Sequence, residues 1–174
     1  MSLRDITKDK HTEAESTAFM KAVFDNKMPL GVWADFTFNK MLFYRAIEGK
    51  ARREGFLDDL EGIDRAELLR QDFFEMNLPA QPRANTIEYL EYLQSLKPGL
   101  ILAHLYTWHM GDLHGGQMIK KMIDAPHHSL EFEDRIGLIN RLRAKLDDGL
   151  GDEANIAFDW AIRIMKDYDD NFGI

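Results

Sequence analysis

The sequence contains no cysteine, and this absence removes several kinds of site at once. Without thiols there is no disulfide, no zinc–thiolate centre, no iron–sulfur cluster held by cysteines and no cysteine nucleophile, which points to a reducing compartment. Hydrophobic residues make up 45% of the 174 positions, enough for one domain with a sizeable core. We therefore expect a single domain that spans residues 1–174.

Long apolar runs and a surplus of positive charge are also missing. Nowhere does a run of about 18 apolar residues occur, and the start, Met1-Ser2-Leu3-Arg4-Asp5, has no apolar core of the kind that a signal peptide carries. We expect a soluble, cytoplasmic protein with no membrane partner. The net charge of −8, from 22 basic and 30 acidic residues, argues against general nucleic-acid binding. An anionic ligand would have to be bound by a local cluster of basic side chains.

Strand-like alternation is nearly absent, and apolar residues recur with helical spacing instead. Ser2 and Asp5 have the spacing of a capping box that begins a first helix, which we expect to continue to about Phe24. Further helices are predicted over residues 31–53, 65–77, 85–96, 98–125, 130–147 and 153–171, with Pro98 in a first turn and Asp152 as a cap. The pattern predicts an all-α, single-domain bundle of roughly six to eight helices.

Three glycines and a carboxylate interrupt a segment that otherwise resembles one continuous helix over residues 100–123. They are Gly111, Asp112, Gly115 and Gly116. Each glycine inside a helix costs roughly 1 kcal/mol relative to alanine, so the segment gives up about 3 kcal/mol of local stability. Gly111 and Gly115 are four residues apart and share a face, so the bare backbone there can kink and contact a bulky planar partner. The pattern predicts a flat ligand against this face.

Arg4, Lys8, His11 and Glu15 fall on one stripe of the first predicted helix. The imidazole of His11 could bind a metal ion such as iron through one nitrogen, while Glu15 or water accepts a hydrogen bond from the other. Arg4 and Lys8 would then suit carboxylates at the edge of the same ligand. Taken alone, the stripe favours a solvated helix face that carries a surface histidine.

Three groups of residues, in this order, carry a resemblance over nearly the whole chain. The first is His11-Thr12-Glu13-Ala14-Glu15 after Lys8, and the second is His104-Leu105-Tyr106-Thr107 with Gly111-Asp112-Leu113 and Gly115-Gly116-Gln117. The third and weaker group is Asp152-Glu153-Ala154-Asn155 with Ala157-Phe158. Together they resemble the proximal-histidine segment, the distal-helix signature and the last helix of the haem oxygenases. The resemblance implies haem sandwiched between the first helix and a kinked, glycine-rich distal helix.

The resemblance also implies a role for each matching residue. His11 would be the proximal ligand of the haem iron, and Glu15 its hydrogen-bond partner. Gly111 and Gly115 would contact the distal face of the ring, Gly116 would help the kink, and Asp112 would order water near bound oxygen. The remaining matches are Arg4, Lys8 and Arg143 near the haem propionates, in preference to Arg141, and Tyr106 near the distal network.

The activity implied is oxidative cleavage of haem b, both substrate and cofactor, to biliverdin, carbon monoxide and Fe²⁺. It would use O2 and electrons from a reduced ferredoxin or similar donor, and a bilin reductase would be a downstream partner. A neutral histidine suits this chemistry because a thiolate would favour O–O cleavage. Lys120 and Lys121 are candidate contacts for an acidic donor. The alternatives are a non-catalytic haem carrier or sensor of the same fold and a thiaminase-like hydrolase, against which the lack of cysteine counts.

Several residues depart from the family pattern. His114 stands where many relatives have serine, and Trp108-His109-Met110 replaces arginine, tyrosine and leucine, so we expect an altered distal network. Ile139 stands where relatives often have a lysine one turn before Arg143. On an ideal helix His114 lies about 60° from Gly111, which favours the pocket rim or an outward position. His104 is expected to be a hydrogen-bonded core histidine.

Overall fold

Eight α-helices account for most of the computed structural model, which describes residues 1–173 and has no strand within them. The helices are α1 (Leu3–Glu15), α2 (Ala18–Phe24), α3 (Leu30–Arg53), α4 (Ala66–Met76), α5 (Ala84–Gln94), α6 (Ile101–Met122), α7 (Arg135–Arg143) and α8 (Gly151–Lys166). Short 3-10 turns occupy His128–Leu130, Asp148–Leu150 and Asp169–Phe172. The predicted all-α bundle is confirmed. No helix within residues 1–173 is long and apolar enough to cross a membrane.

The first predicted helix is in fact two helices. The capping box at its start is confirmed, since the Asp5 N–H donates to Ser2 Oγ at 3.2 Å and the Ser2 N–H to Asp5 Oδ2 at 3.1 Å. The predicted end at Phe24 is wrong for α1, which ends at Glu15. Thr17 takes an extended conformation and accepts the Met20 N–H at 3.2 Å, so it caps a new helix, α2.

Three other predicted boundaries are corrected. Pro98 does not begin the glycine-bearing helix, because Gly99 adopts a φ of +87° and α6 starts at Ile101. The helix predicted over residues 130–147 is the shorter α7, which starts where the Asp134 carboxylate accepts the Gly137 N–H at 3.1 Å.

The last helix, α8, begins at Gly151 and ends at Lys166, so Asp152 lies in its first turn and does not cap it. Gly151 also has a packing role. A Cβ at this position would lie 2.7 Å from Ile6 Cγ2, so only glycine lets the start of α8 approach α1 this closely.

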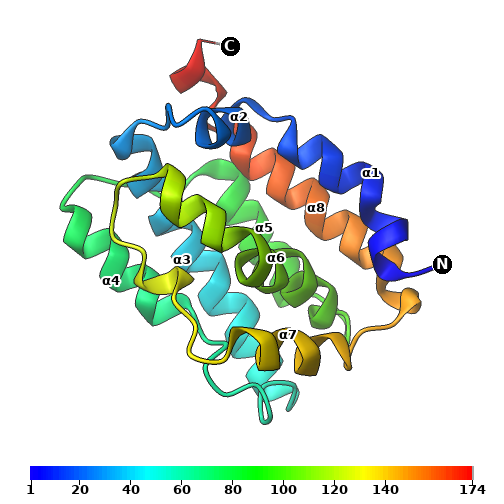
Figure 1. The fold of residues 1–174 in the computed structure, drawn as a ribbon. Helices are drawn as coiled ribbons and strands as arrows, with labels where there is room; N and C mark the ends of the chain where they lie inside the picture. The colour runs from blue at the N-terminus through cyan, green and yellow to red at the C-terminus, as the bar shows by residue number, and fades with distance from the viewer. Residues whose placement is uncertain (174) are drawn as a thin grey trace.

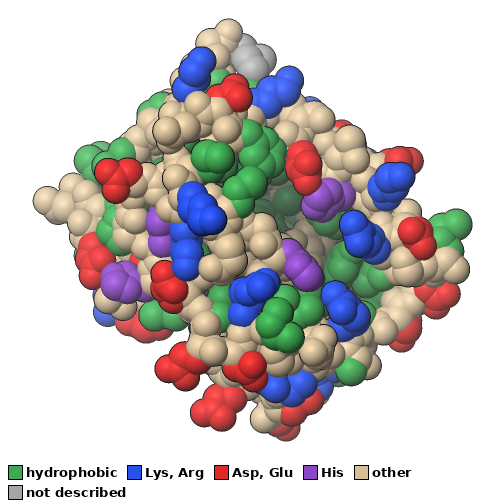
Figure 2. All heavy atoms as spheres, in the orientation of Figure 1, with side chains coloured by type: hydrophobic (Ala, Val, Ile, Leu, Met, Phe, Trp, Pro, Cys, Tyr) green, Lys and Arg blue, Asp and Glu red, His purple; other side chains and the backbone are tan. Residues whose placement is uncertain are grey.

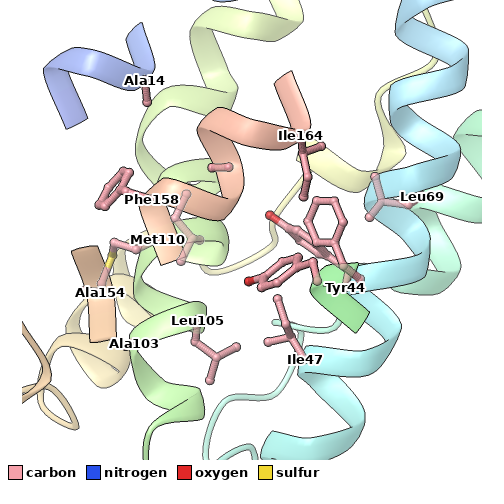
Figure 3. Close-up of a cluster of buried hydrophobic side chains, with 14 of the residues drawn as sticks. Ala14, Tyr44, Ile47, Leu69, Ala103, Leu105, Met110, Ala154, Phe158 and Ile164 are labelled. Carbon is pink, nitrogen blue, oxygen red and sulfur yellow. The ribbon is translucent and has the colours of Figure 1, made fainter. Parts of the chain in front are cut away.

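Helix α6 forms the centre of the bundle and packs against α3 and α8, while α1 lies along α8 (Figure 1). Helices α4 and α5 cover α3. The buried apolar side chains of α1, α3, α6 and α8 form one continuous core, which includes Ala14, Tyr44, Leu105 and Phe158 (Figure 3). Because α8 contacts both α1 and α6, it determines how far apart these two helices lie.

Glu48 on α3 joins three elements through a side chain that is 4% exposed. Its Oε2 accepts the backbone N–H of Arg65 at 2.7 Å and His109 Nε2–H of α6 at 2.7 Å, and its Oε1 accepts the Ala66 N–H at 3.1 Å. These backbone groups lie at the N-terminus of α4, where a negative charge is favourable. Glu48 therefore fixes α4 and α6 to α3.

Glu48→Ala should lower the free energy of unfolding by about 3 kcal/mol or more, because three buried donors lose their acceptor. Urea denaturation followed by circular dichroism measures the change. Glu61→Ala, an exposed acidic residue nearby, is the control and should change stability by no more than about 0.5 kcal/mol. Equal effects of the two substitutions would contradict the role assigned to Glu48.

Candidate functional site

A cleft of about 1360 Å³ opens between α1 and α6. It is lined by residues of both helices, by the segment from Arg143 to Asp148, and by Phe158 of α8. Figure 2 shows this face of the molecule hollowed, with Lys, Arg and His side chains around the hollow. The cleft is larger than the roughly 300–1,000 Å³ of most small-molecule pockets, which suits a large ligand.

On the α1 wall the cleft presents His11. Its Nδ1 lies 3.1 Å from Glu15 Oε1, one turn along the helix, and its ring meets the edge of Phe158 at 5.8 Å between centroids. An imidazole whose Nδ1 is engaged by a carboxylate has its orientation fixed and leaves Nε2 to bind a metal. The structure thus brings together His11 and Glu15 as predicted, with the imidazole 59% exposed at the cleft.

The opposite wall, formed by α6, presents bare backbone at two positions among its side chains. Gly111 and Gly115 of α6 both line the cleft and are exposed, and a Cβ added to either would meet no atom within 4 Å. Packing within the protein therefore does not require glycine at these two positions. Gly116 differs, because it is buried and its added Cβ would lie 2.9 Å from Leu130 Cδ2. The structure brings Gly111 and Gly115 to the cleft, and it places Gly116 against Leu130 instead.

Three cationic side chains reach the cleft, Arg4 and Lys8 from α1 and Arg143 from the end of α7, and His114 of α6 joins them there. The carboxylates of Asp5, Asp147 and Asp148 also line the cleft. Partial burial lowers the pKa of His114, and Arg143, Arg135 and Arg4 lower it further. The part of this shift that comes from the three arginines reflects a more positive potential at His114, which would favour an acidic group of a ligand there. Arg141 does not line the cleft and instead pairs with Asp134 at 3.3 Å.

Asp112 is buried and turned from the cleft toward α3. Its Oδ1 accepts from Lys40 Nζ at 2.8 Å and its Oδ2 from the Tyr44 hydroxyl at 2.6 Å. Burial, followed by the charge of Asp112, raises the pKa of Tyr44 well above its usual value, so the phenol stays a donor. Asp112 follows Gly111 directly, so it lies behind the glycine wall rather than in it.

Tyr106 lines the cleft and links its two walls. Its hydroxyl lies 3.1 Å from Thr7 Oγ1 of α1, and Thr7 also donates to the Leu3 carbonyl at 2.9 Å. The side chain of Thr7 is buried. This hydrogen bond joins α1 to α6 beside the cleft and so helps to set the distance between its walls.

His104 of α6, unlike His114, lies outside the cleft. The side chain of His104 is fully buried. Its Nδ1 shares a hydrogen bond with the Tyr89 hydroxyl at 2.6 Å, and its Nε2 lies 2.9 Å from Glu153 Oε2. Burial lowers its pKa. His104 is therefore a hydrogen-bonded core histidine, as the sequence predicted.

Sequence reasoning missed three residues around the site: Thr7, Lys40 and Tyr44. Lys40 was the easiest to find, because it is a lone cation beside the apolar run Met41-Leu42-Phe43. Lys40 and Tyr44 are also one turn apart, so a helix places both on one face. Their partner on α6 depends on how the helices pack, which no local pattern specifies.

Comparison with known proteins agrees with this geometry. The family model described as heme oxygenase matches residues 1–138. A heme oxygenase of Rhodella violacea is 24% identical over 205 residues, covering 99% of this chain and 87% of that protein. Heme oxygenase 1 of Nostoc is 25% identical over 202 residues, covering 97% of this chain and 85% of that protein.

Solved structures share the fold. Heme oxygenase-2 of Synechocystis, in complex with heme and NO, superimposes with a TM-score of 0.86 at 26% identity, covering 98% of this chain and 84% of that chain. Heme oxygenase-1 of the same cyanobacterium, in complex with heme, gives a TM-score of 0.84 at 24% identity, covering 98% and 91%. With the family model matching well over half of the chain, this protein belongs to the haem oxygenase family, a family of oxidoreductases.

Proposed function

We propose that this chain binds haem b in the cleft between α1 and α6 and cleaves it to biliverdin, carbon monoxide and Fe²⁺. The observation that carries the proposal is the pair of unlike walls: an exposed imidazole held by a carboxylate on α1, and open space over the bare backbone of Gly111 and Gly115 on α6. The open space above Gly111 and Gly115 is what a flat ring would fill. Bound haem would supply the iron that activates O2 and the ring that is opened.

The residues around the cleft would each have a defined role in binding and orienting the haem. His11 Nε2 would bind the iron, with Glu15 fixing the imidazole. Arg4, Lys8 and Arg143 would pair with the two propionates at the basic side of the cleft. The orientation of the ring, and hence the position at which it is cleaved, would follow from these contacts.

On the α6 side, Gly111 and Gly115 would exclude water from most of the distal face and leave room for a small ligand only toward one ring edge. Asp112 would act through water. Its carboxylate is turned toward α3, behind the glycines, and would not contact the ring directly. A positioned water of this kind can deliver a proton to bound oxygen.

The electrons would come from a reduced ferredoxin or a similar acidic donor, and a bilin reductase would consume the product. Lys121 is exposed near the end of α6, whereas Lys120 pairs with Glu131 at 2.9 Å, so Lys121 is the better candidate of the two for contact with a donor. The cytoplasmic location that the sequence predicts is part of this proposal.

Purified protein mixed with hemin, O2 and a ferredoxin system should lose its Soret band while a biliverdin absorbance grows, because the ring is both bound and oxidised. Absorption spectroscopy over time makes the measurement, and a reaction without the electron donor is the control. A Soret band that stays stable under a competent donor would favour the haem carrier or sensor instead.

His11→Ala should weaken hemin binding at least about tenfold, roughly 1.4 kcal/mol, because the iron loses its protein ligand. The spectrum of a histidine-ligated iron should disappear and return when free imidazole is added. His128→Ala is the matched control, since His128 is 43% exposed and pairs with Glu75. A histidine-type spectrum in His11→Ala without imidazole would remove His11 from this role.

Gly111→Ala and Gly115→Ala should each raise the free energy of unfolding of the haem-free protein by about 0.5 to 1 kcal/mol, because the new Cβ meets open space and alanine is the better helix former. Both should weaken hemin binding, since the same Cβ occupies the space proposed for the ring. Thermal unfolding and hemin titration measure the two effects.

Gly116→Ala is the control for this pair. It requires buried Leu130 to move, so it should gain less stability, and it should leave hemin affinity within about twofold because it lies off the cleft. Unchanged hemin affinity in Gly111→Ala and Gly115→Ala would show that the ring does not lie against this wall.

A further inference from the structure

Lys40 places a positive charge in the protein interior beside Asp112. The side chains of Lys40 and Asp112 are only 9% and 8% exposed, and Nζ lies 2.8 Å from Oδ1. Tyr44, one turn further along α3, donates to the other carboxylate oxygen at 2.6 Å. Its ring also lies under the ammonium, at 5.0 Å from the centroid. The carboxylate is therefore held by two donors from one helix, one on each oxygen.

Stability alone does not account for this lysine. Burying an ammonium and a carboxylate costs several kcal/mol per ion, and a pair of this kind is often no better than apolar side chains of similar size. A neutral donor such as Tyr44 would be enough to orient Asp112. What the ammonium adds, and no neutral group could, is a compensating positive charge.

The charged and titratable groups around the pair come from every element packed there. Glu48 of α3 accepts from His109 of α6, whose ring stacks on Tyr44 at 4.3 Å between centroids. Arg65 donates its backbone N–H to Glu48, and burial lowers the pKa of its guanidinium while the charges of Asp112 and Glu48 raise it. The cluster thus holds two acids, Asp112 and Glu48, and two basic side chains, Lys40 and Arg65.

We propose that Lys40 is a positioning residue for the reaction: it fixes and neutralises the Asp112 carboxylate so that its remaining lone pairs can order water behind the glycine wall. This inference rests on the proposed function. A carboxylate has about four acceptor sites, and Lys40 and Tyr44 use one on each oxygen, so one on each oxygen is left for water. Without the ammonium, the buried carboxylate loses its counter-charge and one of its two donors, and both losses disturb that water.

The test uses the ferric hemin complexes of the wild type, Lys40→Met and Lys40→Arg. Methionine keeps the length of the side chain without the charge, and arginine keeps the charge. Arg45→Met is the matched control, because it removes an exposed cation from the same helix. Hemin affinity is measured first, followed by alkaline titration of the visible spectrum, which reports deprotonation of a water on the ferric iron, and by the yield of biliverdin per haem.

Lys40→Met should bind hemin within about threefold of the wild type, because Lys40 does not line the cleft. The alkaline transition should move to higher pH by at least about half a unit, since loss of a nearby cation disfavours hydroxide. Biliverdin yield should fall at least about threefold. Lys40→Arg and Arg45→Met should match the wild type in the alkaline transition and in the yield of biliverdin. A merely structural role for Lys40 would not predict this pattern.

The possible failures are distinguishable. A wild type that binds no hemin would overturn the proposed function and this inference with it. A wild type that turns over hemin alongside a Lys40→Met variant with unchanged transition and yield would overturn this inference alone. Should Lys40→Met not fold, Lys40→Gln replaces it with the same expected shift, and the absence of that shift would count against the role in the same way.

Discussion

The distance between α1 and α6 is the constraint on which the site depends. Both helices pack against α8, and Gly151 lets α8 approach Ile6 of α1 more closely than any other residue would allow. The hydrogen bond between Thr7 and Tyr106 connects the same two helices directly. These contacts hold α1, with the imidazole of His11, opposite α6, with the bare backbone of Gly111 and Gly115, across the cleft.

Electrostatics divides the site into two regions with different purposes. The protein carries a net charge of −8, yet basic side chains gather at the cleft, where they raise the local potential for an acidic ligand. Behind the glycine wall the charges are buried and balanced in pairs, with Lys40 on Asp112 and the Glu48 carboxylate joined to α4 and α6. The first region would orient the ring, and the second would organise the groups that control protons.

Two of the residues at positions 108–110 that depart from the family pattern pack into this second, buried region. Trp108 packs against Phe43 at 4.4 Å between centroids and donates to the Tyr89 hydroxyl, while His109 stacks on Tyr44 and donates to Glu48. Neither side chain lines the cleft. The polar groups that reach Asp112 come from Lys40 and Tyr44 of α3.

Local sequence by itself determined the helical class, most helix positions and the two motifs that form the walls, because helical periodicity, capping residues and glycine spacing are properties of neighbouring residues. It also placed His11, Glu15, Gly111 and Gly115 on the faces that meet at the cleft. It did not resolve the break at Thr17 or the start of α8, where side-chain capping and contact with another helix decided the boundary. Only the tertiary structure decided that Asp112 turns toward Lys40 and Tyr44 and that Gly116 packs on Leu130, because those partners lie far away in the sequence and are brought near by the packing of whole helices.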